Sequence, residues 1–180
     1  MQLIHHTDTE FIFKILKSKE LKSNKLTGNI NQGDGIYDSN SFIYFATTPI
    51  FLDVRTSVPV TLYFDSDILY NRNFYIANMH TSTPDETYRA NKHGYYKTHY
   101  GRYTKNINSI LQKLYNNSMN HKDKKKYFYI FQQIAIKNKV SLKYLTGIDF
   151  GCYTPSDTLL KFISKNYPDI EVKYSERLKN

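Results

Sequence analysis

Two histidines and a threonine follow one another at His5-His6-Thr7, between a predicted strand and a predicted helix. Gln2, Leu3 and Ile4 form a short apolar run that suits the start of a buried strand. From Phe11 to Leu21 apolar residues recur at the spacing of an amphipathic helix, with Asp8 or Thr9 as the expected N-cap. The end of a strand beside a helix N-terminus carries free N–H groups and partial positive charge, so this stretch suits a polar or anionic ligand. The alternative is a capped helix with two incidental histidines.

A second triplet, His80-x-Ser82, raises another kind of chemistry. With His5-x-Thr7 it resembles the paired motifs of two-histidine phosphodiesterases, where both motifs lie on neighbouring strands and the histidines act as acid and base. We expect the preceding strand to end at Asn78 and His80 to lie in a loop. The 6 histidines show no recognised metal-ligand spacing, so we predict no metal site.

A long stretch of the chain is rich in cations and aromatic rings and free of acids. No Asp or Glu occurs from Thr87 to Lys122. Cations that follow a backbone, mixed with flat rings on which bases stack, are what binding of single-stranded nucleic acid requires. The alternative is a solvated basic loop. The candidate nucleic-acid-binding residues are Tyr88, Arg89, Lys92, Tyr95, Tyr96, Lys97, Tyr100, Arg102, Tyr103 and Lys105.

Two adjacent amides, Gln132 and Gln133, lie inside the most strand-like segment of the chain, residues 127–136. Neighbouring residues of a strand point to opposite faces of its sheet. A buried amide needs hydrogen-bond partners, so we expect one of the two to point into a polar cleft.

Short strands alternate with inserted helices along the chain. We predict strands at 42–46, 58–64, 74–78, 127–136 and 170–174, and helices at 107–115 and 156–166. No internal repeat or long linker interrupts this order. The pattern predicts an α+β fold in a single domain that spans residues 1–180.

Charge and cysteine content narrow the class of partner and compartment. Twenty-five Lys and Arg against 16 Asp and Glu give a formal charge of +9, which favours polyanionic partners. A single cysteine, Cys152, excludes an intrachain disulfide and a Cys-rich zinc site and fits a reducing compartment. Because no apolar run approaches the length of a membrane span and no signal-peptide pattern is present, we expect a cytoplasmic protein without a membrane partner.

The ordered set of segments resembles that of DarT-type ADP-ribosyltransferase toxins over most of the chain. Residues 3–7 and the following helix resemble the opening His-x-Thr motif of that family, and residues 43–51 resemble its second motif. Residues 60–82 resemble a segment that ends in an Asn-x-x-Ser motif, and residues 131–148 resemble the closing Gln-Ala-Glu strand and the strand after it. Each motif is short, and the resemblance depends on their order.

The resemblance implies an ADP-ribosyltransferase-like domain, an activity and a set of site residues. The family transfers ADP-ribose from NAD to a base of single-stranded DNA, and CmdT-type relatives modify mRNA; no metal is needed. The nicotinamide half of NAD is expected at His5, His6 and Thr7, with Tyr44 or Phe45 stacked in the same cleft. The tyrosine-rich stretch is expected to hold the nucleic acid. The resemblance also implies an antitoxin protein as partner, within a toxin–antitoxin or phage-defence system.

Two positions depart from the family pattern. Gln133 stands where the family has its catalytic glutamate, which binds the ribose 2′-hydroxyl, stabilises an oxocarbenium-like transition state and helps to deprotonate the attacking amine. A glutamine keeps a hydrogen bond but takes no proton, and loss of a general base costs about 10²–10⁴ in rate. Thr48 stands where the family has an arginine, for which Arg55 is the candidate substitute.

Three explanations for Gln133 compete: an inactivated variant of a toxic protein, which we favour, a natural pseudoenzyme, or a shifted alignment. The leading hypothesis is an NAD-dependent ADP-ribosyltransferase acting on a base of single-stranded nucleic acid. The alternatives are a non-catalytic module that binds single strands and, third, the two-histidine phosphodiesterase.

Overall fold

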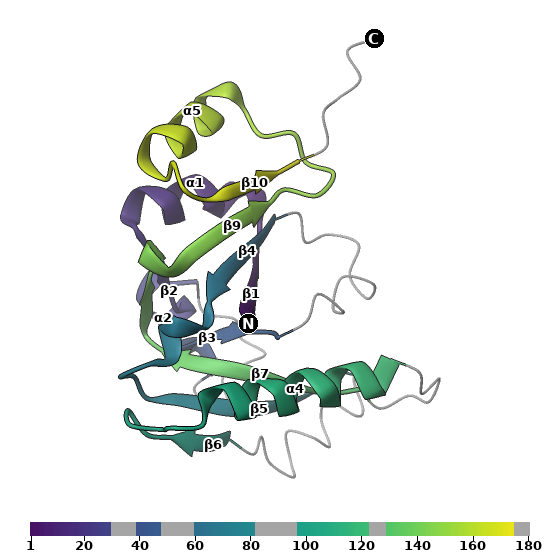
Figure 1. The fold of residues 1–180 in the computed structure, drawn as a ribbon. Helices are drawn as coiled ribbons and strands as arrows, with labels where there is room; N and C mark the ends of the chain where they lie inside the picture. Colours follow the sequence, from purple (N-terminus) through teal and green to yellow (C-terminus); the bar gives the residue numbers. More distant parts are fainter. Residues whose placement is uncertain (30–38, 48–59, 82–96, 123–128, 175–180) are drawn as a thin grey trace.

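Two four-stranded sheets form most of the structure, a computed structural model that describes residues 1–29, 39–47, 60–81, 97–122 and 129–174 (Figure 1). The first sheet has the order β1 (Gln2–Thr7), β4 (Val60–Asp65), β9 (Leu145–Asp149) and β10 (Glu171–Lys173). Only β9 and β10 run parallel, and β1 pairs with β4 over its whole length, from Gln2 opposite Asp65 to Thr7 opposite Val60. This sheet therefore holds the His5-His6-Thr7 segment beside β4.

The second sheet is antiparallel and has the order β3 (Phe42–Phe45), β7 (Tyr129–Lys137), β5 (Phe74–Thr81) and β6 (Lys97–Tyr100). Strand β7 lies between β3 and β5, and its side chains Ile134, Ala135 and Ile136 are buried. Aromatic and β-branched residues dominate these strands, as a pleated and largely buried surface favours.

The two sheets meet where β1 passes the end of β3. The backbone groups of Ile4 and Ala46 exchange two hydrogen bonds of 2.8 Å, and beyond this bridge the strands separate. A small third sheet pairs β2 (Glu20–Lys22) with β8 (Lys139–Ser141). Figure 1 shows the β3-β7-β5-β6 sheet below the β1-β4-β9-β10 sheet.

Three longer helices cover the sheets. α1 (Thr9–Ser18) starts after Asp8 and ends at Lys19, whose left-handed backbone turns the chain into β2. α5 (Asp157–Asn166) starts at Ser156, whose hydroxyl accepts a hydrogen bond from the Leu159 N–H. The short helix α2 (Asn24–Thr27) and the 3-10 turns at Ser39–Ser41, Ser66–Leu69 and Leu142–Tyr144 connect strands.

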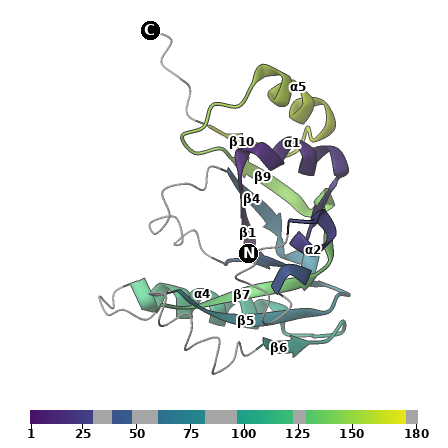
Figure 2. The same cartoon turned by 180° about the vertical axis from the view of Figure 1, so that it is seen from behind.

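α4 (Ile107–Lys122) packs against β7. Its buried residues Ile107, Leu111 and Leu114 join the same apolar cluster as Phe74 and Ile134, so α4 covers the face of the sheet that carries these two side chains. In Figure 1 the helix is drawn in front of β7 and β5, and Figure 2 shows the sheet from the opposite side.

One apolar core joins both sheets and their helices. Phe45 on β3 and Phe64 on β4 are fully buried, and their rings meet edge to face with centroids 5.4 Å apart. None of the described helices is both long and apolar enough to cross a membrane.

The α+β fold of short strands with inserted helices is confirmed. Two expectations need correction: β5 continues to Thr81, so His80 lies on a strand rather than in a loop, and part of the basic stretch forms β6.

Candidate active site

His5 is the residue after Ile4, which is bridged to Ala46 at the end of β3. Its Nδ1 is 3.0 Å from the carbonyl oxygen of Tyr44, and its ring centroid is 5.7 Å from that of Phe45. Because a carbonyl oxygen only accepts hydrogen bonds, Nδ1 carries the proton and donates it. In the neutral ring this leaves Nε2 as an acceptor for a ligand hydroxyl or N–H group.

The surroundings of His5 keep its imidazole neutral at physiological pH. Burial, together with the neighbouring His6, lowers the pKa of His5 to about 4, against the opposing effect of the hydrogen bond to Tyr44. A positive charge on this ring would lack the water that stabilises it elsewhere. His5 is therefore suited to orient a ligand through a hydrogen bond, and its imidazolium form is rare at neutral pH.

His6 points to the other face of β1. Its Nδ1 lies 3.2 Å from the hydroxyl oxygen of Thr61, the residue opposite it on β4. Its Nε2 is buried and has no hydrogen-bond partner among the residues the structure describes, and burial lowers the pKa of His6. Thr7 is half-buried at the end of β1, directly before Asp8 and α1. The three residues thus offer polar atoms on both faces of one strand end.

Gln133 lies one strand away from this junction. Phe45 pairs with Ile134, so the next positions along the two antiparallel strands are Ala46 and Gln133, and Ala46 is the residue bridged to Ile4. The Oε1 atom of Gln133 is buried and has no hydrogen-bond partner in the described part of the chain. An unpaired buried amide oxygen is costly, so this atom is suited to accept a hydrogen bond from a ligand hydroxyl.

Tyr44 and Phe45 take opposite faces of β3. Phe45 is fully buried against Phe64 and His5, so it is a core residue and offers no free ring face to a cofactor. Tyr44 is half-buried on the face that Gln133 shares, because Tyr44 is paired with Ala135 and Ala135 is two residues from Gln133. Of the two predicted stacking residues, Tyr44 therefore remains the candidate.

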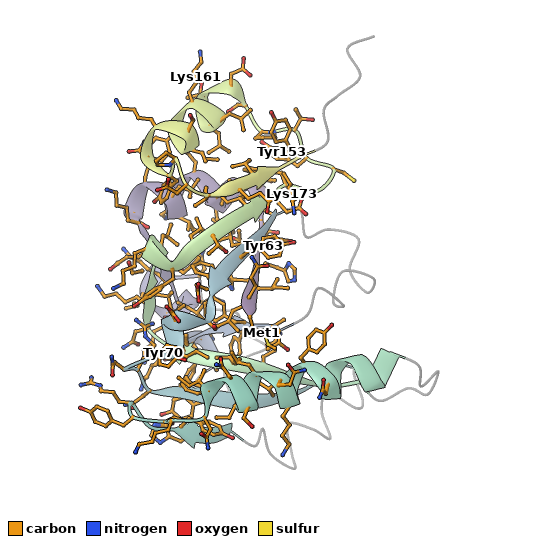
Figure 3. All side chains as sticks on the ribbon, viewed as in Figure 1. Met1, Tyr63, Tyr70, Tyr153, Lys161 and Lys173 are labelled. Carbon is orange, nitrogen blue, oxygen red and sulfur yellow. The ribbon has the colours of Figure 1, made fainter. Side chains whose placement is uncertain are left out.

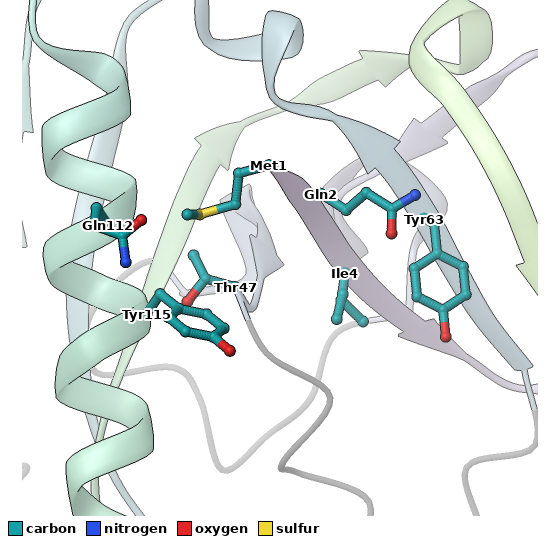
Figure 4. Close-up of a pocket in the computed structure, with 7 residues that line it drawn as sticks. All are labelled: Met1, Gln2, Ile4, Thr47, Tyr63, Gln112 and Tyr115. Atoms are coloured by element: carbon teal, nitrogen blue, oxygen red, sulfur yellow. The ribbon is translucent and has the colours of Figure 1, made fainter.

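A cavity of about 440 Å³ borders the junction of the two sheets (Figure 4). Its walls combine the N-terminal strand with α4 and the end of β3, and a cavity of this size suits part of a cofactor-sized ligand. The hydroxyl of Thr47 is buried and, within the described ranges, makes no hydrogen bond. The lining residues are Met1, Gln2, Ile4, Thr47, Tyr63, Gln112 and Tyr115.

The predicted nucleic-acid-binding stretch is described only from Lys97 onward, and for Lys97 only its backbone, in β6. Arg102, Tyr103 and Lys105 are exposed. The Tyr100 ring stacks on Phe74 at 5.2 Å and packs against the core, which argues against Tyr100 as a stacking surface for a base. Outside the described residues lie Arg55, Tyr88, Arg89, Lys92, Tyr95 and Tyr96, together with Thr48.

The structure does not support the paired-histidine phosphodiesterase. His5 is on β1 and His80 on β5, and two strands, β3 and β7, separate them across the sheet junction. Histidines that act as acid and base on one substrate need neighbouring positions.

No group of three or more His, Cys, Asp or Glu side chains in the described ranges could hold a metal ion.

Two polar residues of this region were missed by sequence reasoning. Thr61 contacts His6 through strand pairing, and Thr47 lines the cavity just after β3. Thr61 lies within an apolar run and carries no local signal, since its role depends on the register between β1 and β4. Thr47 follows the predicted strand 42–46, and its position at a strand end was the available signal.

Comparison with known proteins finds a likeness among solved structures. No protein-family profile and no curated protein matches the chain. Among solved structures, the fold matches Thermosipho africanus DarTG in complex with ADP-ribose with a TM-score of 0.57 and 13% sequence identity. The match covers 96% of this chain and 49% of that one, so the chain spans about half the length of that protein. The chain therefore has an α+β fold of the ADP-ribosyltransferase type.

Proposed function

We propose that this protein is an NAD-dependent ADP-ribosyltransferase that acts on a base of single-stranded DNA or RNA. The observation that carries the proposal is the junction of β1, β3 and β7, where the neutral His5 and the unpaired Oε1 of Gln133 lie one strand apart. The chain shares its fold with a protein solved with ADP-ribose, the portion of NAD that such an enzyme transfers.

In the proposed reaction the bond between nicotinamide and ribose C1′ breaks, and nicotinamide leaves with the bonding electrons. A nitrogen of the base attacks the ribosyl cation that develops, and its proton passes to a base or to solvent. Nε2 of His5 accepts a hydrogen bond from a ribose hydroxyl, and Thr7 and His6 supply further polar contacts. Tyr44 gives the nicotinamide ring a face to pack on, and Arg55 is proposed as a catalytic residue in place of the family's arginine.

Gln133 limits the rate in this proposal. Its Oε1 accepts a hydrogen bond from the ribose 2′-hydroxyl, but an amide neither takes up the proton of the attacking amine nor places a negative charge beside the ribosyl cation. A carboxylate at this position supplies both, and general-base catalysis alone contributes about 10²–10⁴ in rate.

The test is transfer of label from radioactive NAD to single-stranded DNA and RNA. Gln133→Glu should raise the transfer rate about 10²–10⁴-fold over the present chain. Gln132→Glu is the matched control, since it adds the same charge at the neighbouring position of the chain and should leave the rate unchanged. Absence of transfer to either nucleic acid by Gln133→Glu would reject the proposal.

A non-catalytic module that binds single strands is the second candidate, and Gln133 itself favours it because the position lacks a carboxylate. This candidate requires salt-dependent binding that is equal with glutamine and glutamate at position 133, and no consumption of NAD in either case. NAD turnover by Gln133→Glu decides between the two functions.

We further propose that the protein acts in the cytoplasm as a toxin of a toxin–antitoxin or phage-defence system, with an antitoxin protein encoded beside it. Expression of Gln133→Glu should then arrest growth, and expression of the neighbouring gene should restore it. Growth arrest that persists with every neighbouring gene would contradict this role.

A further inference from the structure

The face of the β3-β7-β5-β6 sheet opposite α4 carries a row of aromatic rings. Directly paired residues of antiparallel strands point to the same face. Tyr44 pairs with Ala135, Ala135 with Tyr75, and Tyr75 with His99, so one row crosses all four strands. Gln133 belongs to the same face, since it lies two residues before Ala135 on β7 and opposite Ala77 on β5.

The rings of this row contact one another. Phe42 meets Tyr75 edge to face with centroids 5.3 Å apart and lies 6.4 Å from Tyr44. The ring of Tyr75 is 4.9 Å from that of His99. His99 is exposed and Tyr75 is half-buried, in contrast to Tyr100, which turns to the α4 face and packs on Phe74. The two β6 residues differ because successive side chains of a strand point to opposite faces.

A basic pocket lies at the end of the same strands. It has a volume of about 730 Å³ and is lined by Lys137, the last residue of β7, and Asn73, directly before β5, together with Arg72, Lys139 and Lys22. Lys137 pairs directly with Phe42, whose ring contacts Tyr75. The pocket therefore continues the face that carries the rings.

The charges of the pocket are only partly neutralised. Glu20 binds Lys139 at 2.8 Å and lies 3.9 Å from Lys22. Lys137 and the half-buried Arg72 have no carboxylate partner in the part of the chain that the structure describes. Arg72 is held by a hydrogen bond of 3.4 Å from its Nη1 to the carbonyl oxygen of Lys139. Two cations thus remain available to an anion.

We propose that a single-stranded nucleic acid lies along this face, with a base stacked on Tyr75 and His99 and a backbone phosphate in the pocket of Arg72 and Lys137. From Gln133 to Lys137 the strand advances four residues, about 13 Å, which places the phosphate a few nucleotides from the target base. This inference rests on the proposed function for the role of Gln133, but the strand-binding face itself does not require NAD.

Binding of labelled single-stranded oligonucleotides, in DNA and RNA arms without NAD, tests the proposal by fluorescence anisotropy over a series of salt concentrations. Lys137→Gln should lower the slope of log affinity against log salt by about 0.7, the value for one lost phosphate contact on a single strand. Tyr75→Ala should weaken binding about 5- to 100-fold and leave the slope unchanged, because a stacked base carries no charge.

Lys161→Gln and Tyr153→Ala are matched controls. Both residues are exposed and lie in the α5 region, away from the ring row (Figure 3). They should change neither affinity nor slope. Arg72→Gln should lower the salt slope as Lys137→Gln does. The melting temperature shows whether loss of the Arg72 hydrogen bond unfolds the chain. If it does, Lys137→Gln still tests the proposal, because Lys137 is exposed.

Two outcomes overturn the proposal. The first is that neither Lys137→Gln nor Tyr75→Ala, as folded protein, changes the affinity for the oligonucleotide or its salt slope. This outcome overturns the proposal even if the same variants lose binding to an acidic protein. The second is equal affinity for a duplex of the same length, because paired bases cannot stack on Tyr75. Binding of NAD, measured separately by calorimetry, should be the same in these variants, so failure of this proposal and failure of the NAD-dependent activity give different results.

Discussion

At the scale of single residues, His5 and Gln133 show how environment decides what a side chain contributes. The hydrogen bond of 3.0 Å to the Tyr44 carbonyl and the burial of the ring make His5 a neutral residue whose Nε2 is an acceptor nitrogen. Gln133 keeps a buried oxygen without a partner in the described part of the chain. Both atoms are able to accept a hydrogen bond from a ligand hydroxyl, and neither side chain is a strong base.

The lowered pKa of His5 predicts how stability depends on pH. The pKa of this group falls from 6.5 in the unfolded chain to about 4 in the folded one. Between these values the unfolded chain binds a proton that the folded chain excludes, so stability should decrease by about 3 kcal/mol as the pH falls from 6.5 to 4.

Urea denaturation at a series of pH values measures this effect. His5→Gln should flatten the profile in that window, whereas Ser156→Ala should lower it by the same amount at every pH. An unchanged profile in His5→Gln would show that other groups cause the dependence.

At the scale of secondary-structure elements, β7 organises the candidate site. It pairs with β3 on one side and β5 on the other, and it joins Gln133, the small Ala135 of the ring row and Lys137 of the basic pocket on one face. The alternation of a strand places these three residues together. The opposite residues, Ile134 and Ile136, hold the strand in the core.

The N-termini of α1 and α5 offer a paired test, because only one of them has a side-chain cap. The Ser156 hydroxyl accepts from the Leu159 N–H, whereas the Asp8 side chain makes no capping hydrogen bond at α1. Ser156→Ala should therefore lower the free energy of unfolding by about 1 kcal/mol. Asp8→Ala should cost less, and calorimetric melting of both variants measures the difference. A greater loss in Asp8→Ala would contradict the assignment of the caps.

At the scale of the whole molecule, the candidate site exists because two sheets meet at one backbone bridge. Ile4 and Ala46 hold the sheets together, and the fully buried rings of Phe45 and Phe64 fill the space beside that bridge. Phe45 also contacts His5, so the core packing supports the ring that would hold the ligand. The stability of the fold and the geometry of the site are thus linked through one residue.

Phe45→Ala should destabilise the protein by about 3–5 kcal/mol, because it removes a large buried side chain and leaves a cavity. Phe45→Leu keeps most of the volume and should cost much less. Loss of affinity for NAD should accompany Phe45→Ala even where the variant is folded, since His5 loses its support. Urea denaturation and calorimetric NAD titration measure the two effects, and a loss below about 1 kcal/mol would contradict the packing argument.

The amino-acid sequence by itself determined the main elements, because hydrophobic periodicity and caps are local. Apolar periodicity predicted the helices that became α1, α4 and α5, and the strand with two glutamines became β7. The limits of β5, and with them the position of His80, were wrong because polar residues continue that strand through pairing with β7. A strand end whose backbone hydrogen bonds come from a strand distant in sequence leaves no signal in its own residues.

Only the tertiary structure decided which residues share the candidate site. His5 reaches Tyr44 across 39 residues of sequence and His6 reaches Thr61 across 55, and these contacts depend on strand pairing and register. Burial likewise separated Phe45 and Tyr100, which pack in or against the core, from Tyr44 and His99 on the other face. Residue type predicts what chemistry a side chain is capable of, whereas its neighbours in space set its protonation, its partners and the face it offers.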